Sequence, residues 1–302
     1  ASISSARGLK HYVSKRDLMD NYLLNIKDLT ITSTNPKRTL IENLSLQLKE
    51  NRNLALVGES GSGKTTITKA ILGFLPENCL IKTGSILFED IDITKLSPKE
   101  LHKIRGQKIA TILQNAMGSL TPSMRIGMQI IETLRQHHKM NKEEAYNKAM
   151  QLLTDVCIPN PKYSFSQYPF ELSGGMRQRV VIAIALASQP KLILADEPTT
   201  ALDSMSQAQV LRILRNIQQQ KQATILLVTH NLSLVKELCN DICIIKDGKL
   251  IETGTVEEIF LSPKHPYTLK LLNAVSKIPI KKTSSPILKN KFQPLMSMQG
   301  GL

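Results

Sequence analysis

The stretch from Asn53 to Leu75 places a glycine-rich loop between a short apolar run and a segment with helical spacing. The loop fits the pattern GxxxxGK[ST] through Gly58, Gly63, Lys64 and Thr65. Backbone N–H groups in such a loop and at the start of the helix attract an anion, because they lack intrahelical partners and the helix dipole is positive there. A strand, this loop and a helix, in that order, predict a phosphate-binding loop (P-loop) in an α/β nucleotide-binding domain.

The loop residues predict how a nucleotide would be held. Lys64 is expected to reach the β- and γ-phosphates, and the hydroxyl of Thr65 is expected to ligate Mg²⁺. The alternative is a glycine-rich turn without a ligand, which the pattern and its strand–helix context together disfavour. The predicted phosphate-binding residues are Gly58, Ser60, Gly61, Gly63, Lys64, Thr65 and Thr66.

Short apolar runs alternate with helical patterns from Leu23 onward, which is typical of a mostly parallel sheet covered by helices. We therefore expect an α/β fold of the P-loop NTPase type, with a RecA-like core, an N-terminal antiparallel β portion and an inserted helical subdomain. The predicted strands lie at 53–58, 108–114, 191–196, 223–230 and 242–248, and the predicted helices include 204–220 and 232–238.

Pattern and composition divide the chain into five predicted segments. Residues 1–18 lack periodicity and precede Met19, a plausible start, so we interpret them as a leader extension or a cloning remnant. The other segments are 19–117, the first part of the core with the P-loop; 118–170, the helical subdomain; 171–262, the second part of the core; and 263–302, a C-terminal extension with a basic tail.

Length and composition allow a large core, since the chain has 302 residues of which 41% are hydrophobic. The longest apolar run, Val180–Ala187, is far shorter than the roughly 20 residues that span a bilayer. No signal peptide pattern opens the sequence, which indicates a cytosolic location. The cysteines form no CxxC pair, so we interpret all four as reduced core thiols rather than a metal site: Cys79, Cys157, Cys239 and Cys243.

A net charge of +14 indicates an acidic partner, and nucleic acid, anionic lipid headgroups and nucleotide phosphates all qualify. Residues 275–302 contain five lysines and no acidic residue. This tail is expected to be loosely ordered and close to something negative, or else to be a solvated tail without a partner.

Two carboxylates, Asp196 and Glu197, directly follow the apolar run "KLILA". An unpaired buried charge is costly, so they need a cationic partner. We expect Asp196 to contact Mg²⁺ and Glu197 to act as the base that polarises the attacking water. The alternative is a pair of acids that cap the following helix.

A second glycine-bearing stretch suited to an anion is "LSGGMRQRV", residues 172–180, in which Ser173 precedes a helical segment. One nucleotide site needs only one such cradle. This stretch is similar to the signature motif of the nucleotide-binding subunits of ATP-binding cassette (ABC) transporters. The similarity extends in family order to "ILQN" with Gln114, "TALD" with Asp203 and "LLVTHNL" with His230, and it covers about 23–260.

The resemblance implies an ATPase in which two subunits sandwich two ATP molecules, each with Mg²⁺. Ser173, Gly174, Gly175 and Asp203 would then serve the ATP on the opposite subunit's P-loop. The implied partners are a second homologous ATPase subunit or a second copy of this chain, two transmembrane permease subunits and an extracytoplasmic substrate-binding protein. The chain would lie peripherally on the cytoplasmic face of the cell membrane.

The resemblance also implies that Gln114 senses Mg²⁺ or the attacking water and links the site to the permease, and that His230 hydrogen-bonds the γ-phosphate. Alone, each is a weak signal, because such residues at strand ends are commonly structural. Many family members stack an aromatic residue on adenine, but none lies between Tyr22 and Phe74. Without such an aromatic residue, the candidates to support adenine are Ile31, Leu40 and Arg38.

Within the family, residues 114–130 and "SPKHPYT", 262–268, resemble the ATPases of oligopeptide, dipeptide and nickel importers. Many peptide-importer ATPases carry a cysteine cluster for an iron–sulfur centre after that end, whereas no cysteine follows Cys243. We therefore expect no iron–sulfur cluster, and the substrate prediction tilts toward nickel or another chelated metal, with short peptides as the alternative.

Two rival functions share these motifs. Soluble ABC ATPases act on nucleic acid or ribosomes, but they break the cassette with a long coiled coil or carry two cassettes, whereas this chain has one uninterrupted cassette. A regulatory subunit without hydrolysis is disfavoured because Glu197, His230 and Ser173 are all present. We expect no nucleic acid partner.

Overall fold

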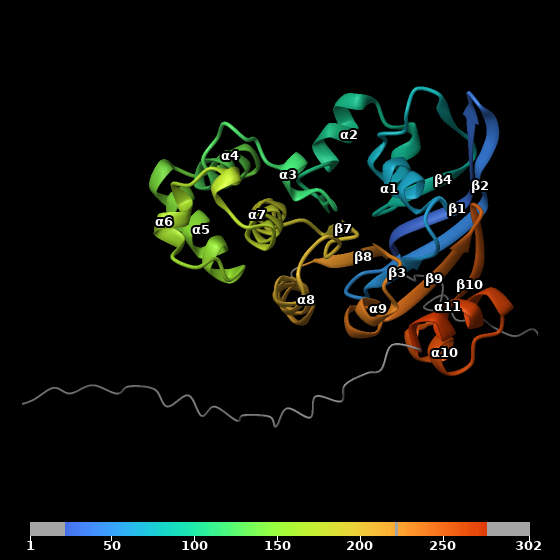
Figure 1. The fold of residues 1–302 in the computed structure, drawn as a ribbon. Helices are drawn as coiled ribbons and strands as arrows, with labels where there is room; N and C mark the ends of the chain where they lie inside the picture. The colour runs from blue at the N-terminus through green and yellow to red at the C-terminus, as the bar shows by residue number, and fades with distance from the viewer. Residues whose placement is uncertain (1–21, 221–222, 277–302) are drawn as a thin grey trace, which may run out of the picture.

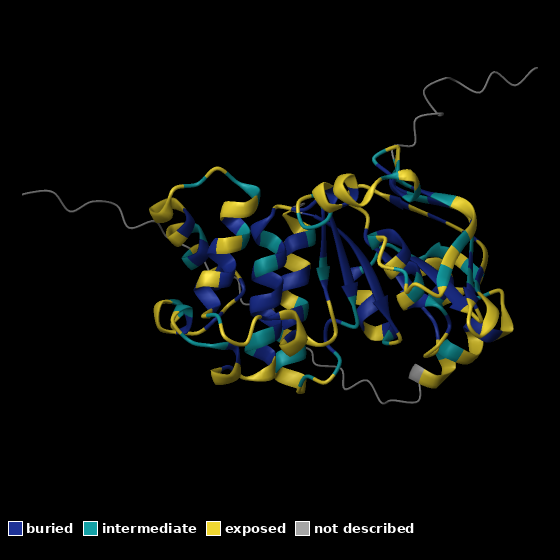
Figure 2. Cartoon of the chain, turned by 90° about the horizontal axis from the view of Figure 1, so that it is seen from above, coloured by how far each residue is buried: buried dark blue, intermediate teal, exposed yellow. Residues whose placement is uncertain are grey.

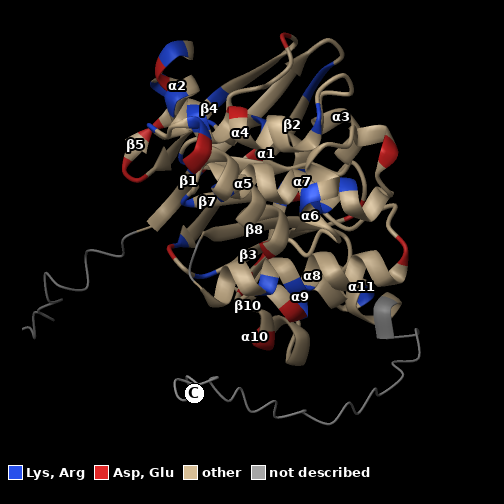
Figure 3. Cartoon of the chain, turned by 90° about the vertical axis from the view of Figure 1, so that its left-hand side faces the viewer, with Lys and Arg blue, Asp and Glu red and all other residues tan. Residues whose placement is uncertain are grey.

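The structure, a computed structural model, describes residues 22–220 and 223–276 (Figure 1). The predictions for residues 1–18 and for the basic tail from Lys277 onward lie outside these ranges. More than half of the net charge of +14 belongs to residues outside them. On the face in Figure 3, lysines and arginines are spread over several elements with acids among them, rather than gathered over one element.

The amino-terminal part forms an antiparallel sheet, as the sequence predicted. Its strands pair in the order β2-β1-β4-β5, and irregularities interrupt the register of β1 with β2 and with β4. The bounds are β1 Tyr22–Thr34, β2 Lys37–Lys49, β4 Cys79–Phe88 and β5 Ile91–Asp92.

The core sheet has six strands in the order β10-β9-β3-β8-β7-β6. Five of these strands are parallel to one another, and β10 pairs with β9 antiparallel at one edge. The prediction of a P-loop fold on a mostly parallel sheet is therefore confirmed. The bounds are β3 Leu54–Val57, β6 Ile109–Ile112, β7 Leu192–Asp196, β8 Thr224–Thr229, β9 Asp241–Lys246 and β10 Lys249–Thr255.

Continuous apolar runs form the central strands because both faces of this sheet are covered. Side chains alternate between two hydrophobic clusters. Ala55 and Val57 of β3 face the cluster that contains the helices after residue 115, whereas Leu54 and Leu56 face the cluster shared with the antiparallel sheet and helix α1. Figure 2 shows this buried layer in dark blue. The sheet therefore holds two halves of the protein together.

Helices provide the rest of the fold, and in Figure 1 α4, α5 and α6 lie on the side of the molecule away from the antiparallel sheet. Described residues between 118 and 170 contain no strand. The proposed domain boundaries stay a prediction. The helical elements are α1 Lys64–Leu72, η1 Ile93–Lys95, α2 Pro98–Ile104, α3 Ala116–Ser119, α4 Ile126–His137, α5 Lys142–Asp155, α6 Pro161–Phe165, η2 Pro169–Glu171, α7 Gly174–Ala187, α8 Ser204–Gln219, α9 Leu232–Leu238, α10 Val256–Leu261 and α11 Pro266–Ser276.

The apolar run at Val180–Ala187 lies in α7, which packs between the core sheet and helices α4 and α5. Within the described ranges, no helix combines the length and hydropathy needed to cross a membrane. The four cysteines are free thiols, but the prediction that all lie in the core is wrong. Cys157 is exposed because it follows the end of α5, where the chain turns at the surface, and Cys79 is half-buried.

Candidate nucleotide site

The predicted P-loop follows β3 and leads into α1, and two of its glycines are required by its shape. Gly63 has a φ of 104°, in the region that favours glycine. A Cβ on Gly58 would lie 2.2 Å from the carbonyl oxygen of Ile245, so only glycine lets the loop approach β9 this closely. The sequence folds this way locally because glycine stands at both positions.

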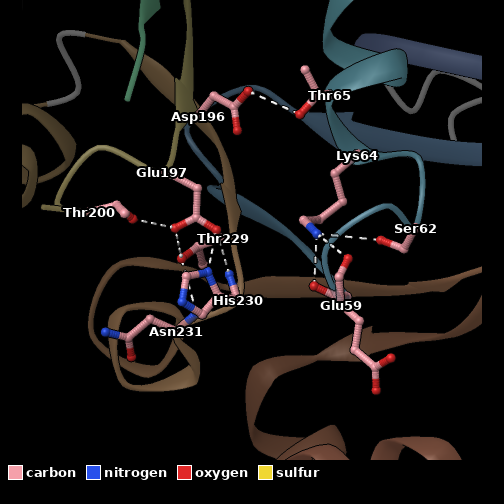
Figure 4. Close-up of polar contacts among 11 residues, drawn as sticks. Glu59, Ser62, Lys64, Thr65, Asp196, Glu197, Thr200, Thr229, His230 and Asn231 are labelled. Atoms are coloured by element: carbon pink, nitrogen blue, oxygen red, sulfur yellow. Dashed lines mark hydrogen bonds and ion pairs between the residues drawn. The ribbon is translucent and has the colours of Figure 1, made fainter. Parts of the chain in front are cut away.

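Lys64 lies against the loop that precedes it (Figure 4). Its Nζ donates to the carbonyl oxygens of Gly58 and Glu59, each at 2.8 Å. The residue is 8% exposed, and this burial lowers the pKa of the ammonium, while the charges of Glu197 and Asp196 oppose that shift. The ammonium is thus already positioned in the loop, where exchanging these carbonyl contacts would let it reach a phosphate.

Asp196 ends strand β7 opposite the start of α1. The hydroxyl of Thr65 donates to its Oδ2 at 3.5 Å. Burial raises the pKa of Asp196, Glu197 raises it further, and Lys64 works against the shift. A hydroxyl, a carboxylate and the amide of Gln114, which lies after β6 and lines the same cavity, form the oxygen-donor set that Mg²⁺ favours. These residues fit the metal that the sequence predicted.

Glu197 is the most firmly held carboxylate of the site. Its Oε1 accepts from the backbone N–H of His230 at 3.0 Å and contacts the Nδ1 of the same residue at 2.6 Å. Its Oε2 accepts from the hydroxyls of Thr200 at 2.9 Å and Thr229 at 3.3 Å. The alternative that the two acids cap a helix is wrong, because Asp203 caps the next helix, α8.

A cavity of about 960 Å³ gathers most of the predicted residues at the carboxyl ends of β3, β6, β7 and β8. Gly58 does not line the cavity, because it lies against Ile245 of β9. The sequence did not point to Thr39, Glu59, Thr200 or the Asp247–Gly248 turn between β9 and β10, although "DG" is a hairpin signal. The predicted residues that line the cavity are Ser60, Gly61, Gly63, Lys64, Thr65, Thr66, Gln114, Asp196, Glu197 and His230.

The three residues predicted to support the adenine base lie in different surroundings. Arg38 and Leu40 line the cavity and also a smaller adjoining one of about 300 Å³. Ile31 is fully buried and pairs with Ile41 and Ile81 inside the antiparallel sheet. The prediction for Ile31 is wrong, because its side chain contributes to the core beneath the site.

The signature residues do not line this chain's own cavity as the described residues form it. Ser173 caps α7 by accepting from the N–H of Met176 at 3.2 Å. Asp203 caps α8, and hydrogen bonds from Ser206 and Met205 lower its pKa. A Cβ on Gly174 would lie 3.9 Å from its nearest neighbour, the Cδ2 of Leu202, whereas a Cβ on Gly175 would lie 2.2 Å from the Oγ of Ser206.

A P-loop after β3 and an acid pair at the end of the parallel strand β7, with β8 between the two strands, define a P-loop nucleoside triphosphatase. The model of the ABC transporter family matches residues 41–200, and the model of the oligopeptide/dipeptide transporter C-terminal region matches residues 251–301. The chain belongs to the ATP-binding subunits of ABC transporters. It is an ATPase that powers import through such a transporter, and the family prediction is confirmed.

Relatives support the same assignment. The oligopeptide transport ATP-binding protein OppD of Bacillus subtilis is 45% identical over 253 residues, which cover 83% of this chain and 71% of that protein. The dipeptide transport ATP-binding protein DppD of Lactococcus lactis is 44% identical, with coverage of 78% and 68%. The dimeric ATP-binding cassette MJ0796 with bound ADP and phosphate has 28% identity, a TM-score of 0.69 and coverage of 77% and 98%.

Proposed function

We propose that this chain binds ATP with Mg²⁺ in the P-loop cavity and hydrolyses it with Glu197 as the base. The observation that carries this proposal is the Glu197 carboxylate, held by four contacts at the rim of a cavity that also holds Lys64. A carboxylate fixed in this way is oriented before a water molecule arrives, which is what general-base catalysis needs.

The residues divide the proposed reaction among them. Lys64 and the loop N–H groups bind the phosphates, while Thr65, Asp196 and Gln114 hold Mg²⁺, which neutralises phosphate charge when it is bound. Glu197 accepts a proton from water while the oxygen of that water bonds to the γ-phosphorus. The bond between the γ-phosphorus and the oxygen of the β-phosphate breaks, which gives ADP and phosphate. His230 lines the cavity and contacts Glu197 through Nδ1, which leaves Nε2 as the ring nitrogen that would hydrogen-bond the γ-phosphate.

A second ATPase subunit completes the proposed assembly. The similar cassette MJ0796 is a dimer with bound ADP and phosphate. The position of Ser173 and Gly174 outside this chain's own cavity supports their use on a partner's ATP. We propose a sandwich of this chain with a related subunit or with a second copy of itself.

Short peptides are the substrate class that we propose. The relatives are named for oligopeptide and dipeptide transport, and the carboxyl-terminal match carries the same description. The tilt toward nickel, based on the absence of cysteine after Cys243, has no support from these names and stays a prediction, as does the expectation of no iron–sulfur cluster. We propose that an extracytoplasmic substrate-binding protein, rather than this chain, recognises the transported peptide.

Two permease subunits are the membrane partners that we propose, with this chain peripheral on the cytoplasmic face. A cavity of about 350 Å³ lies between α1, α2, β6 and α7, and two of its apolar side chains, Phe74 and Leu113, are exposed. Leu113 precedes Gln114 of the nucleotide cavity, and its carbonyl oxygen accepts from Gln178 of α7 at 3.3 Å. A cytoplasmic permease segment seated here would lie next to the catalytic site.

Replacing Phe74 with Asp is expected to reduce detergent-resistant copurification with the permeases about tenfold, because the exposed apolar surface of the ring is lost from the contact and the carboxylate can pair with Arg105, which lies over the ring. ATP binding by the isolated chain should stay unchanged. Leu261→Asp on α10 is the matched control, since that side chain is also exposed. Equal recovery of permeases with both variants would contradict the proposed contact, and salt-sensitive recovery of nucleic acid would favour the rival function.

Lys64→Ala is expected to weaken ATP binding roughly 10- to 100-fold, because the phosphates would lose charge-assisted hydrogen bonds. Calorimetric titration of the full chain measures this. Lys99→Ala on α2 removes an exposed positive charge outside the cavity and should bind normally. Near-normal binding by Lys64→Ala would remove the P-loop from the proposed site.

A further inference from the structure

The segment Ser262–Thr268, so far only a mark of the importer subgroup, contacts the P-loop directly. The backbone N–H of Glu59 donates to the hydroxyl oxygen of Tyr267 at 3.3 Å. Tyr267 opens α11 and is 6% exposed, with its ring packed into the hydrophobic cluster of the core sheet. The carboxyl-terminal extension therefore contacts the second residue of the P-loop.

Glu252 of β10 holds this segment in place. It accepts hydrogen bonds from the N–H groups of Lys264 at 2.8 Å and His265 at 3.1 Å, and from the hydroxyl of Thr268. Burial alone would raise the pKa of Glu252, but these hydrogen bonds lower it. The carboxylate thus stays ionised and fixes the turn that presents Tyr267. We name Glu252 together with residues 264–268 the C-terminal latch.

Glu59 connects the C-terminal latch to the lysine of the site. Its N–H is bonded to Tyr267, and its carbonyl oxygen accepts from the Nζ of Lys64 at 2.8 Å. If Lys64 turns toward a phosphate, it exchanges contacts with the loop carbonyls, of which Glu59 supplies one. The bond to Tyr267 then remains to restrain the start of the loop.

We propose that Tyr267 is a positioning residue that keeps the P-loop in its nucleotide-binding shape and thereby raises ATP affinity. This inference rests on the proposed ATP site at the P-loop and makes the C-terminal latch a part of that site. Tyr267 acts through the backbone of Glu59, without touching the nucleotide. The C-terminal extension therefore contributes to ATP binding by this chain, apart from any partner that it contacts.

Tyr267→Phe tests the proposal, because it removes one oxygen and keeps the buried ring. The dissociation constant for ATP and the KM for hydrolysis are expected to rise about three- to tenfold, the effect of one lost hydrogen bond, with kcat changed less than about twofold. Titration with a fluorescent ATP analogue and steady-state kinetics on the full chain measure both. Tyr163→Phe is the matched control, since Tyr163 on α6 is 68% exposed.

A second variant keeps the test decisive if the first perturbs folding. Thr268→Val removes one of the three hydrogen bonds that Glu252 accepts, and it should also raise KM. The double variant should raise KM by less than the product of the two single effects, because both changes act through one contact. A lower melting temperature of Tyr267→Phe with unchanged KM, or additive effects, would overturn the proposal. Lys64→Ala with intact binding would instead refute the ATP site itself.

Discussion

Glu197→Gln should lower ATP hydrolysis by a factor of about 100 or more and leave ATP binding intact. The amide oxygen can still accept from the N–H of His230, and its NH2 group can donate to the hydroxyl oxygen of Thr200, so the loop keeps its shape, but the amide cannot take a proton from water. Phosphate release measured beside equilibrium binding separates these two effects.

A matched variant shows whether the loss of hydrolysis comes from the position of Glu197 or only from the loss of a negative charge. Glu132→Gln on α4 removes the same charge from an exposed position and should hydrolyse ATP normally. If Glu197→Gln turned over ATP at the rate of the unmodified chain, the base would be another group, and the contacts of Glu197 would serve only to order the loop around His230.

Gly174→Asp should prevent nucleotide-driven closure with the partner subunit and abolish hydrolysis at the partner's P-loop. A carboxylate there would lie against a γ-phosphate in a partly desolvated interface, at a cost of about 1 to 4 kcal/mol. The chain itself should fold, because the nearest atom to a new Cβ is 3.9 Å away and an acid in the first turn of a helix is favourable. Binding at its own P-loop should therefore survive.

The measurement uses a mixed assembly with the change in this chain only, assayed for ATP binding and for closure. Gly174→Asn is the matched control, since it has the same size without the charge. Gly175 is a poorer probe, because any side chain there collides with Ser206 of α8 and disturbs the packing of α7 on α8. Loss of this chain's own ATP binding with normal closure would assign the signature to the local site.

Local patterns predicted the parts of the site that local chemistry determines. Ser173 and Asp203 cap helices as their position before helical segments indicated, and Lys64 follows a buried strand and a glycine loop. These features depend on residues within a few positions of each other. Backbone hydrogen bonds and helix ends determine their local conformation, whereas the packed sheet places them in the site.

The sequence was not sufficient to predict which side of the antiparallel sheet Ile31 faces. Irregular pairing of β1 with β2 and β4 shifts the register near Ile31, so alternation along the strand does not reveal which side chains face the site. The contacts of Tyr267 with Glu59 and of Gly175 with Ser206 join distant segments, and no local pattern encodes them. Only the packed sheet and helices bring such residues together.

The strand order of the core sheet has a consequence for synthesis on the ribosome. Leu54 of β3 pairs with Leu226 of β8 on one side and with Asp241 of β9 on the other, so the strand before the P-loop has no sheet neighbour until those late segments emerge. A nascent chain carries the phosphate-binding pattern long before it can form the site. The P-loop becomes a binding site only when nearly all of the described chain has been translated.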